Sequence, residues 1–171
     1  EKAKELLKQA GYENGFEFTV RVPSNYQFHV DTTQVIVEQL KAVGITMKID
    51  SIDWNTWVSD VYVGRNYEAT VVGIDSTLAP KDIMLRYQSE YTKNFCNYKS
   101  AEYDKVLGEA IAAIDQEEKI ALYKQAQKIL AEDAASVFIQ DPAKLVAVSK
   151  KVGGYTFYPL YVQDMATIYI K

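Results

Sequence analysis

The sequence is poor in the residues that most often bind metals. Among its 171 residues there is one cysteine, Cys96, and one histidine, His29. A single cysteine cannot form a disulfide within the chain, and no cluster of cysteine and histidine ligands is available to hold zinc. We therefore expect no metal site and no cofactor. Cys96 is predicted to be a small buried apolar side chain, and His29 to lie on an exposed loop without a function.

Long apolar runs are absent as well. No stretch approaches the ~20 consecutive apolar residues that a membrane-spanning helix requires, and residues 1–4 form a charged run in place of a signal peptide. We expect a domain that is itself soluble. Because 48% of the residues are hydrophobic and 25% are charged, the chain can bury one core, so a single compact domain is predicted.

Clustered positive charge is also missing. The chain has 19 Lys and Arg residues against 23 Asp and Glu residues, which gives a net charge of −4. The cations are scattered along the predicted helices, whereas phosphate binding needs them gathered on one surface. Nucleic acid is therefore not expected as a partner.

The sequence does contain a regular alternation of strand and helix patterns. Apolar residues alternate with polar ones over residues 16–22 and again over residues 45–49, which is the period of a strand. Between them, Asp31 is predicted to cap a helix that ends at Gly44. A strand, a helix and a second strand in this order predict a right-handed βαβ unit with parallel strands.

The patterns after residue 50 also alternate between strands and helices. The nearly uninterrupted apolar run at residues 69–74 predicts a strand that is covered on both faces and lies inside the sheet. Three helices are expected, over residues 54–63, 106–114 and 115–130. Three further strands are expected, over residues 137–139, 145–148 and 166–170. The predicted fold class is α/β, with a mixed, mostly parallel sheet flanked by helices.

Asp75 directly follows the predicted buried strand. Ligands of open α/β sheets lie beyond the carboxyl ends of the strands. A carboxylate there, followed by Ser76 and Thr77 and closed by Pro80, could pair with a cationic group such as an α-ammonium. A charge-assisted hydrogen bond of this kind is worth about 1.5–3 kcal/mol. The alternative is that Asp75 only caps a turn or the next helix, and position alone favours the cap.

Two other groups could border a ligand. Trp54 and Trp57 are three residues apart and share a helical face, so one could anchor the core while the other faces the ligand. Asn94 and Phe95 lie in a polar and aromatic loop that either borders a cleft or caps the helix that starts near Ser100. Both alternatives stay open at the level of the sequence.

Enzyme chemistry has little support. A Ser-His-Asp triad would have to use His29, and no Gly-x-Ser-x-Gly motif is present. Asp50 and Asp53 could form the carboxylate pair of a glycoside hydrolase. Paired acids more often lie on solvated faces. We predict that the chain is not an enzyme.

Seven segments together carry a resemblance to a known family. They are AKELLKQAGY at 3–12, LKAVGI at 40–45, DWNTW at 53–57, GID at 73–75 with AP at 79–80, NYKSAEYD at 97–104, LYKQAQKIL at 122–130 and VGGY at 152–155. In this order and spacing, the sequence resembles the C-terminal part of the family 5 extracellular solute-binding proteins. These are the dipeptide and oligopeptide receptors of ABC importers.

The resemblance implies a lobe of the type II periplasmic-binding-protein fold, in which two lobes close on a ligand. Asp75 matches the aspartate that pairs with the ligand's α-ammonium, and Trp54 matches a tryptophan beside the cleft. Two departures concern the shape of the pocket. Val72 stands where relatives often have tryptophan, and the spacing from Asp75 to Pro80 is one residue longer.

The resemblance also implies a division of the chain, its partners and its location. Residues 1–152 would form the C-terminal ligand-binding lobe, and residues 153–171 would return to the other lobe. The expected partners are a peptide, the membrane permease and the remaining lobe, at the extracellular face of the cell membrane or in the periplasm. A sugar, a metal complex or haem is the alternative ligand. The predicted ligand-binding residues are Asp75, Trp54, Ser76, Thr77, Asn94 and Phe95.

Overall fold

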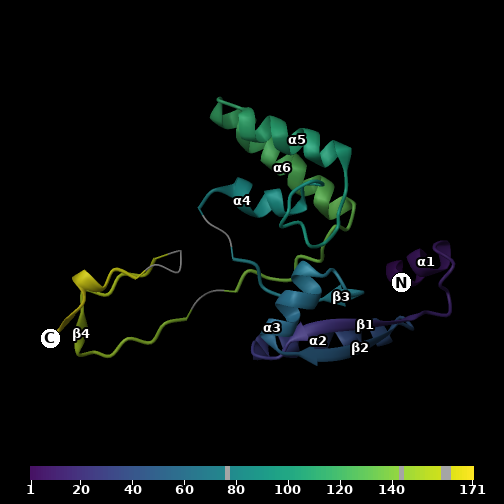
Figure 1. The fold of residues 1–171 in the computed structure, drawn as a ribbon, viewed down its shortest axis with the longest axis horizontal. Coiled ribbons are helices and arrows are strands. Elements are labelled where there is room, and N and C mark those ends of the chain that lie inside the picture. Colours follow the sequence, from purple (N-terminus) through teal and green to yellow (C-terminus); the bar gives the residue numbers. More distant parts are fainter. Residues whose placement is uncertain (76–77, 143–144, 159–162) are drawn as a thin grey trace. The chain divides into compact units, whose positions relative to one another are not determined.

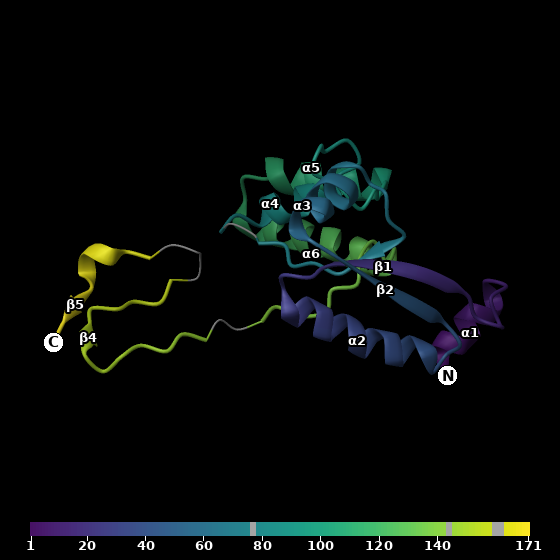
Figure 2. The same cartoon turned by 60° about the horizontal axis from the view of Figure 1, so that its bottom comes forward.

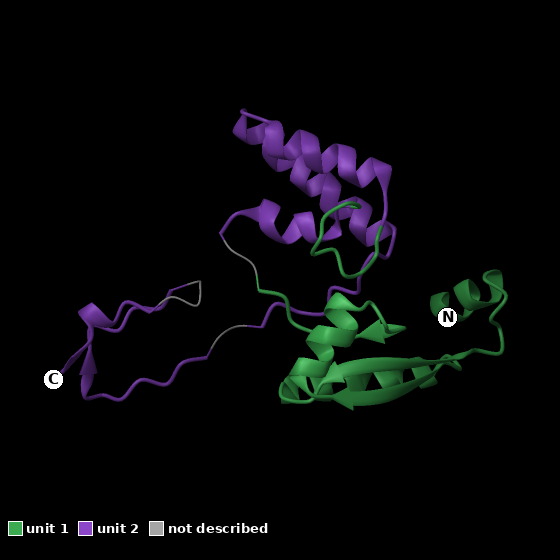
Figure 3. Ribbon diagram, viewed as in Figure 1, with its two compact units in different colours: residues 1–75, 89–98 green, residues 76–88, 99–171 purple. Residues whose placement is uncertain are grey.

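The computed structural model describes residues 1–75, 78–142, 145–158 and 163–171 (Figure 1). The chain forms two compact units, where composition predicted one (Figure 3). The first unit comprises Glu1–Asp75 and Ser89–Tyr98, and the second comprises Ser76–Gln88 and Lys99–Lys171. The expected functional boundary between residues 152 and 153 stays a prediction.

The first unit is built on a parallel sheet of three strands in the order β2-β1-β3. Strand β1 (Glu17–Pro23) pairs in parallel with β2 (Thr46–Ile52) along its whole length. Strand β3 (Ala69–Thr70) pairs in parallel with the other side of β1. The predicted βαβ unit with parallel strands is therefore confirmed.

The apolar run at residues 69–74 differs from its prediction. Only its first two residues are strand, and within the described sheet β3 is an edge strand, not an interior one. The physical reason lies in the next residues, because Val72 and Ile74 pack against the buried side chains of Trp57 and Phe95 instead of a further strand. The apolar side chains of the run are thus covered by side chains of a helix and a loop.

Helix α2 (Gln27–Lys41) joins β1 to β2 and lies along one face of their sheet (Figure 2). It begins earlier than predicted, because Tyr26 is its N-cap residue. Asp31 is not a cap, since its carboxylate accepts a hydrogen bond of 2.8 Å from the Gln27 side chain. His29, predicted on an exposed loop, therefore lies in the first turn of α2 and is buried.

The core between α2 and the sheet is mostly apolar. Buried Val20, Val22 and Met47 from the strands meet partly buried side chains of the helix. The helix side contributes Val30, Ile36, Val37 and Leu40. The chain leaves the helix through Gly44, whose φ of +89° is in the left-handed region that favours glycine, as the sequence predicted.

The segment after β2 is helical over the predicted residues 54–63, but its second part is wider than an α-helix. It consists of α3 (Trp54–Thr56) followed by the π-helix η1 (Trp57–Val63). Asp53 begins α3 as its N-cap, because its carboxylate accepts from the backbone N–H groups of Asn55 at 2.9 Å and Thr56 at 3.2 Å.

The second unit contains helices α4 (Pro80–Met84), α5 (Ala101–Ala112) and α6 (Gln116–Glu132), with the 3₁₀ turn η2 (Leu85–Tyr87). Helices α5 and α6 pack side by side (Figures 1 and 2). Their buried residues include Tyr103, Val106, Leu107, Ala110, Ala126, Ile129 and Leu130.

The caps of this unit match the sequence pattern. An aspartate followed by a glutamate three residues later is a capping pattern, and Asp115 caps α6 by accepting a hydrogen bond of 2.9 Å from the backbone N–H of Glu118. Ser100 caps α5 with its own hydroxyl oxygen, which accepts from the N–H of Tyr103 at 3.2 Å. The Tyr103 hydroxyl, fully buried, donates to the carbonyl of Met84 at 2.6 Å.

The C-terminal part contains fewer strands than predicted. In the described structure residues 137–139 and 145–148 are not strand, because they have no partner strand to pair with, and most of their apolar side chains are exposed. Strand β4 (Val152–Gly153) pairs antiparallel with β5 (Tyr169–Ile170). The strand predicted at residues 166–170 is thus confirmed only at its end, after the 3₁₀ turn η3 (Met165–Thr167).

Candidate functional site

The candidate site lies at the carboxyl edge of the parallel sheet in the first unit. All three strands run in the same direction, so their C-terminal ends meet at one edge. Tyr26 follows β1, Trp54 follows β2, and residues 71–75 follow β3. We call Tyr26, Trp54 and Trp57 the aromatic wall.

The two tryptophans of the aromatic wall are stacked but differ in burial. Their ring centroids are 5.0 Å apart with an interplanar angle of 10°. Trp57 is 3% exposed, whereas Trp54 is 37% exposed. The Tyr26 ring meets Trp54 edge-on, at 5.4 Å and 82°. Trp57 is therefore the core anchor of the pair, and Trp54 is the tryptophan that a ligand can reach.

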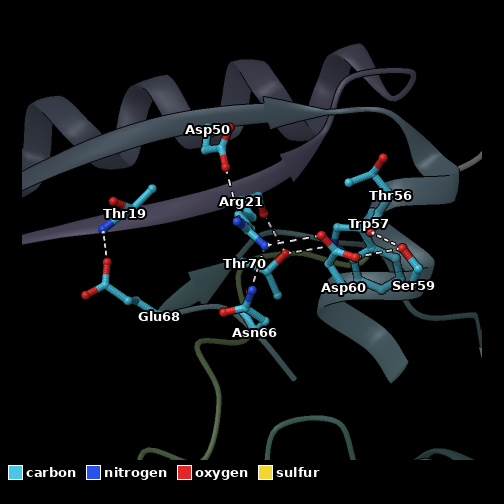
Figure 4. A network of polar contacts seen from close by, with 10 residues as sticks. All are labelled: Thr19, Arg21, Asp50, Thr56, Trp57, Ser59, Asp60, Asn66, Glu68 and Thr70. Carbon is cyan, nitrogen blue, oxygen red and sulfur yellow. Dashed lines mark hydrogen bonds and ion pairs between the residues drawn. The ribbon is translucent and has the colours of Figure 1, made fainter. Parts of the chain in front are cut away.

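A series of hydrogen bonds holds Trp57 in place (Figure 4). Its indole Nε1 donates to Thr70 Oγ1 at 2.9 Å, and that hydroxyl donates to the carbonyl of Arg21 at 2.6 Å. The Arg21 guanidinium in turn donates to the Asn66 carbonyl at 2.8 Å and pairs with Asp50 at 3.2 Å. The buried ring is thus tied to both β1 and β3, which fixes the surface on which Trp54 stacks.

Asp50 and Asp53, considered as a glycosidase pair, are both engaged in structural contacts. Asp50 pairs with Arg21. The pKa of Asp53 is lowered, chiefly by the hydrogen bond from the Thr56 hydroxyl. A glycosidase needs a general acid whose pKa is raised. Asp50 is occupied by its ion pair with Arg21, and the lowered pKa of Asp53 is opposite to what a general acid needs.

Asn94 and Phe95 are both buried, in the loop that belongs to the first unit. The ring centroids of Phe95 and Trp57 are 6.0 Å apart. The backbone carbonyl of Phe95 accepts a hydrogen bond of 2.6 Å from the Tyr67 hydroxyl. Asn94 donates from Nδ2 to the carbonyl of Tyr98 at 2.8 Å. The structure places Phe95 behind Trp57 of the aromatic wall. Contact of Asn94 and Phe95 with a ligand stays a prediction.

Burial also affects the titratable groups beside this loop. It raises the pKa of the Tyr67 phenol to about 12 and raises the pKa of the Cys96 thiol. Cys96 packs against the Trp57 cluster, so the environment of its side chain is apolar, as predicted. The side chain is only half-buried, whereas full burial was predicted. A thiol with a raised pKa is a poor nucleophile at neutral pH.

Asp75 ends the extended segment that follows β3. Gly73 and Asp75 are exposed, whereas Val72 and Ile74 are half-buried in the Trp57 cluster. This alternation turns Asp75 away from the core. Helix α4 has Ala79 as its N-cap, without a side-chain hydrogen bond, so the interpretation of Asp75 as the cap of that helix is wrong. Its pairing with an ammonium group stays a prediction.

Ser76 and Thr77, the other two predicted site residues, lie outside the described residues. Among the residues that are described, no group of three or more His, Cys, Asp or Glu side chains is placed to hold a metal ion. In the same part of the chain, no helix has both the length and the apolar character needed to cross a membrane.

Tyr26 and His29 are site residues that the sequence reasoning missed. Tyr26 forms the edge of the aromatic wall, and the His29 ring lies 5.3 Å from it. For Tyr26 the available signal was its place shortly after the carboxyl end of β1, the same rule that selected Asp75. A lone histidine gives no pattern by which to predict its burial.

Comparison with known families assigns the first 95 residues. The family model of the bacterial extracellular solute-binding proteins, family 5 Middle, matches residues 1–95. The chain is 28% identical to the oligopeptide-binding protein AppA of Bacillus subtilis in an alignment 173 positions long, which covers 92% of this chain and 32% of that protein. It is 26% identical to the periplasmic oligopeptide-binding protein OppA of Escherichia coli, over 91% of this chain and 29% of that protein.

Solved structures agree with the sequence relatives. The periplasmic binding protein DppA of Helicobacter pylori in complex with the peptide STSA matches with a TM-score of 0.84 and 31% identity, over 99% of this chain and 34% of that one. AppA of Bacillus subtilis in complex with a nonapeptide matches with a TM-score of 0.85 and 25% identity, over 99% of this chain and 37% of that one. The chain therefore spans about a third of the length of its relatives.

The parallel α/β unit and these matches define a lobe of the type II periplasmic-binding-protein fold, so the predicted fold class is confirmed. The chain belongs to family 5 of the bacterial extracellular solute-binding proteins. The resemblance seen in the sequence is thereby confirmed as well. Members of this family bind solutes and are not classed as enzymes.

Proposed function

We propose that this chain is the ligand-gripping part of a peptide receptor that serves an ABC importer. The observation that carries the proposal is an exposed carboxylate, Asp75, and an exposed stacked tryptophan, Trp54, at the carboxyl edge of one parallel sheet. Relatives named as oligopeptide-binding and dipeptide-binding proteins, and two solved complexes with peptides, support peptide as the ligand class.

Each part of the site has a chemical role in this proposal. Asp75 pairs with the α-ammonium of the peptide by a charge-assisted hydrogen bond. Trp54 offers a flat apolar surface to a peptide side chain, and Trp57 supports it from below. Strand β3 is at the edge of the described sheet, so an extended peptide can align with the chain that follows it. Phe95 supports Trp57 from behind, and Asn94 holds the loop through its hydrogen bond to the Tyr98 carbonyl.

The receptor works by capture and not by catalysis in this proposal. A peptide binds between two lobes, the hinge closes, and the closed form is recognised by the membrane permease. This chain contributes one lobe, and residues 153–171 return to the other. The whole receptor acts at the extracellular face of the membrane or in the periplasm, as its relatives' names suggest.

Native mass spectrometry of the full-length receptor, purified without refolding, tests the ligand class. We expect the protein to carry a mixture of bound masses that fragment as peptides. The control is the same receptor after unfolding, dialysis and refolding, which should lose those masses. A bound sugar, a metal complex or haem in place of peptides would contradict the proposal.

A further inference from the structure

His29 is the buried residue of the site that neither the fold nor the proposed function explains. Its side chain is 6% exposed. Neither Nδ1 nor Nε2 has a hydrogen-bond partner among the described residues. Buried polar atoms without partners are rare and usually have a cause. An unpartnered histidine next to a candidate ligand site therefore calls for an explanation beyond packing.

The ring of His29 touches both sides of the candidate site. On one side it packs against the rings of Tyr26 and Phe28, with centroid distances of 5.3 Å and 4.0 Å. On the other side it lies against the backbone at Gly73, since a Cβ atom at that position would be 3.0 Å from His29 Nε2. Tyr26 leads directly to Trp54, and Gly73 is two residues before Asp75. The ring thus lies between Tyr26, at the edge of the aromatic wall, and the backbone at Gly73.

Electrostatics keep this ring uncharged. Burial lowers the pKa of His29, and it is the sole cause of the shift. The titratable groups on the surrounding elements are the Tyr26 phenol, the Asp31 carboxylate on α2 and the Asp75 carboxylate after Gly73. Asp31 is exposed and accepts from the Gln27 side chain. None of these groups offsets the cost of a buried imidazolium.

We infer that His29 is a positioning residue of the candidate site, whose neutral ring sets the distance between Tyr26 and the backbone at Gly73. The inference rests on the proposed function for its consequence in ligand binding. Protonation adds a charge and a second N–H donor to a place without acceptors, so the ring must move toward water. When it moves, Tyr26 loses its contact with the His29 ring, the edge-on contact of Tyr26 with Trp54 is disturbed, and the shape of the site changes in acid.

A ligand-free titration tests the positioning role first. The 171-residue chain has only the tryptophans Trp54 and Trp57, so its fluorescence reports on the aromatic wall. We expect a reversible change in emission with a midpoint below pH 6.5, the ordinary pKa of histidine. The change should be absent in His29→Phe, which keeps a ring of similar size, and in His29→Leu as a second non-titrating variant. The same transition in both variants, or none in the unmodified chain, would overturn the inference.

A double-mutant cycle tests the contact with the backbone. Gly73→Ala should lower the free energy of unfolding of the unmodified chain, because the new Cβ meets Nε2 at less than normal contact distance. In the His29→Ala background the same change should cost little, because the space is open. An equal cost in both backgrounds would show that the ring does not press on this segment and would contradict the inference.

Peptide binding by the full-length receptor supplies the functional readout. With the tetrapeptide Ser-Thr-Ser-Ala as the probe, we expect binding at pH 5 to be about tenfold weaker than at pH 7.5, and His29→Phe to bind equally at both pH values. Loss of binding by the unmodified receptor at every pH would contradict the proposed function while the fluorescence test still decides the role of His29. Normal binding with the same acid loss in His29→Phe would reject the positioning role alone.

Discussion

Trp54 and Trp57 are similar in sequence context but have different tasks. Both belong to the same stacked pair, yet only Trp57 is held by a hydrogen bond from its indole to Thr70. Since that indole is buried, its N–H must keep an acceptor. The fixed position of Trp57 is therefore a condition for the exposed surface of Trp54.

Removal of the Thr70 hydroxyl should destabilise the first unit. Thr70→Val keeps the shape of the side chain but leaves the Trp57 N–H without its acceptor, at a cost of about 1–3 kcal/mol. The measurement is urea unfolding of the 171-residue chain followed by tryptophan fluorescence. Thr46→Val on the exposed side of β2 is the matched control and should change the free energy by less than about 0.5 kcal/mol. Equal effects of both variants would contradict the role of Thr70.

Asp53 is expected to contribute to the pH dependence of the stability of the chain. Its pKa in the folded chain is below the ordinary value of 3.8, mainly because of the hydrogen bond from Thr56. The unfolded chain therefore binds more protons in this range, so stability is present above pH 3.8 and is lost as the pH falls through the lower folded value. Asp53→Asn, which cannot titrate, should lack this part of the acid loss when urea unfolding is compared from pH 6 to pH 3. An unchanged acid profile would contradict the assignment.

Single residues also show where sequence reasoning stops. Asp75 was a candidate because it follows a predicted strand, although its position alone favoured a cap, and the family resemblance selected both Asp75 and Trp54 as ligand contacts. His29 could not be placed, because its burial depends on helix α2 starting at Gln27 and not at Asp31. The sequence pattern does not fix that start, since Asp31 can serve either as a cap or as a partner of Gln27.

At the scale of elements, the sequence patterns predicted β1, α2 and β2 well. Both strands have long alternating patterns, and the helix presents one apolar face that packs on them. The position of β3 was not predictable, because an apolar run looks the same whether a strand or aromatic side chains cover it. The strands at residues 137–139 and 145–148 were not found because a strand requires a partner, and the described chain offers none there.

Replacement by alanine is expected to have opposite effects on stability at two glycines. Gly15 has a φ of +74°, and a Cβ there would lie 1.8 Å from the Gly44 carbonyl oxygen, so Gly15→Ala should prevent the close contact of the two loops and strongly destabilise the first unit. Gly108 lies within α5 with open space around its Cβ position, so Gly108→Ala should stabilise the second unit by about 0.5–1 kcal/mol. Thermal unfolding followed by circular dichroism measures both. Stabilisation by Gly15→Ala would contradict the close contact.

At the scale of the whole molecule, the chain is about a third of the length of its relatives. If two lobes grip the ligand, this chain holds half of the contacts. We therefore predict that the 171-residue chain alone binds peptides weakly or not at all, in contrast to the full-length receptor. Calorimetry with Ser-Thr-Ser-Ala measures both. A micromolar Kd for the chain alone would contradict the two-lobe grip.

The pairing of Asp75 with a peptide α-ammonium is the central claim, and a cycle of four binding constants tests it most directly. The full-length receptor and its Asp75→Asn variant are each titrated with Ser-Thr-Ser-Ala and with its N-acetylated form, and Asp141→Asn is the control for an exposed aspartate. We predict that Asp75→Asn weakens binding of the free peptide by about 10- to 150-fold and has little further effect on the acetylated peptide. Equal losses for both peptides, or no loss for either, would contradict the claim.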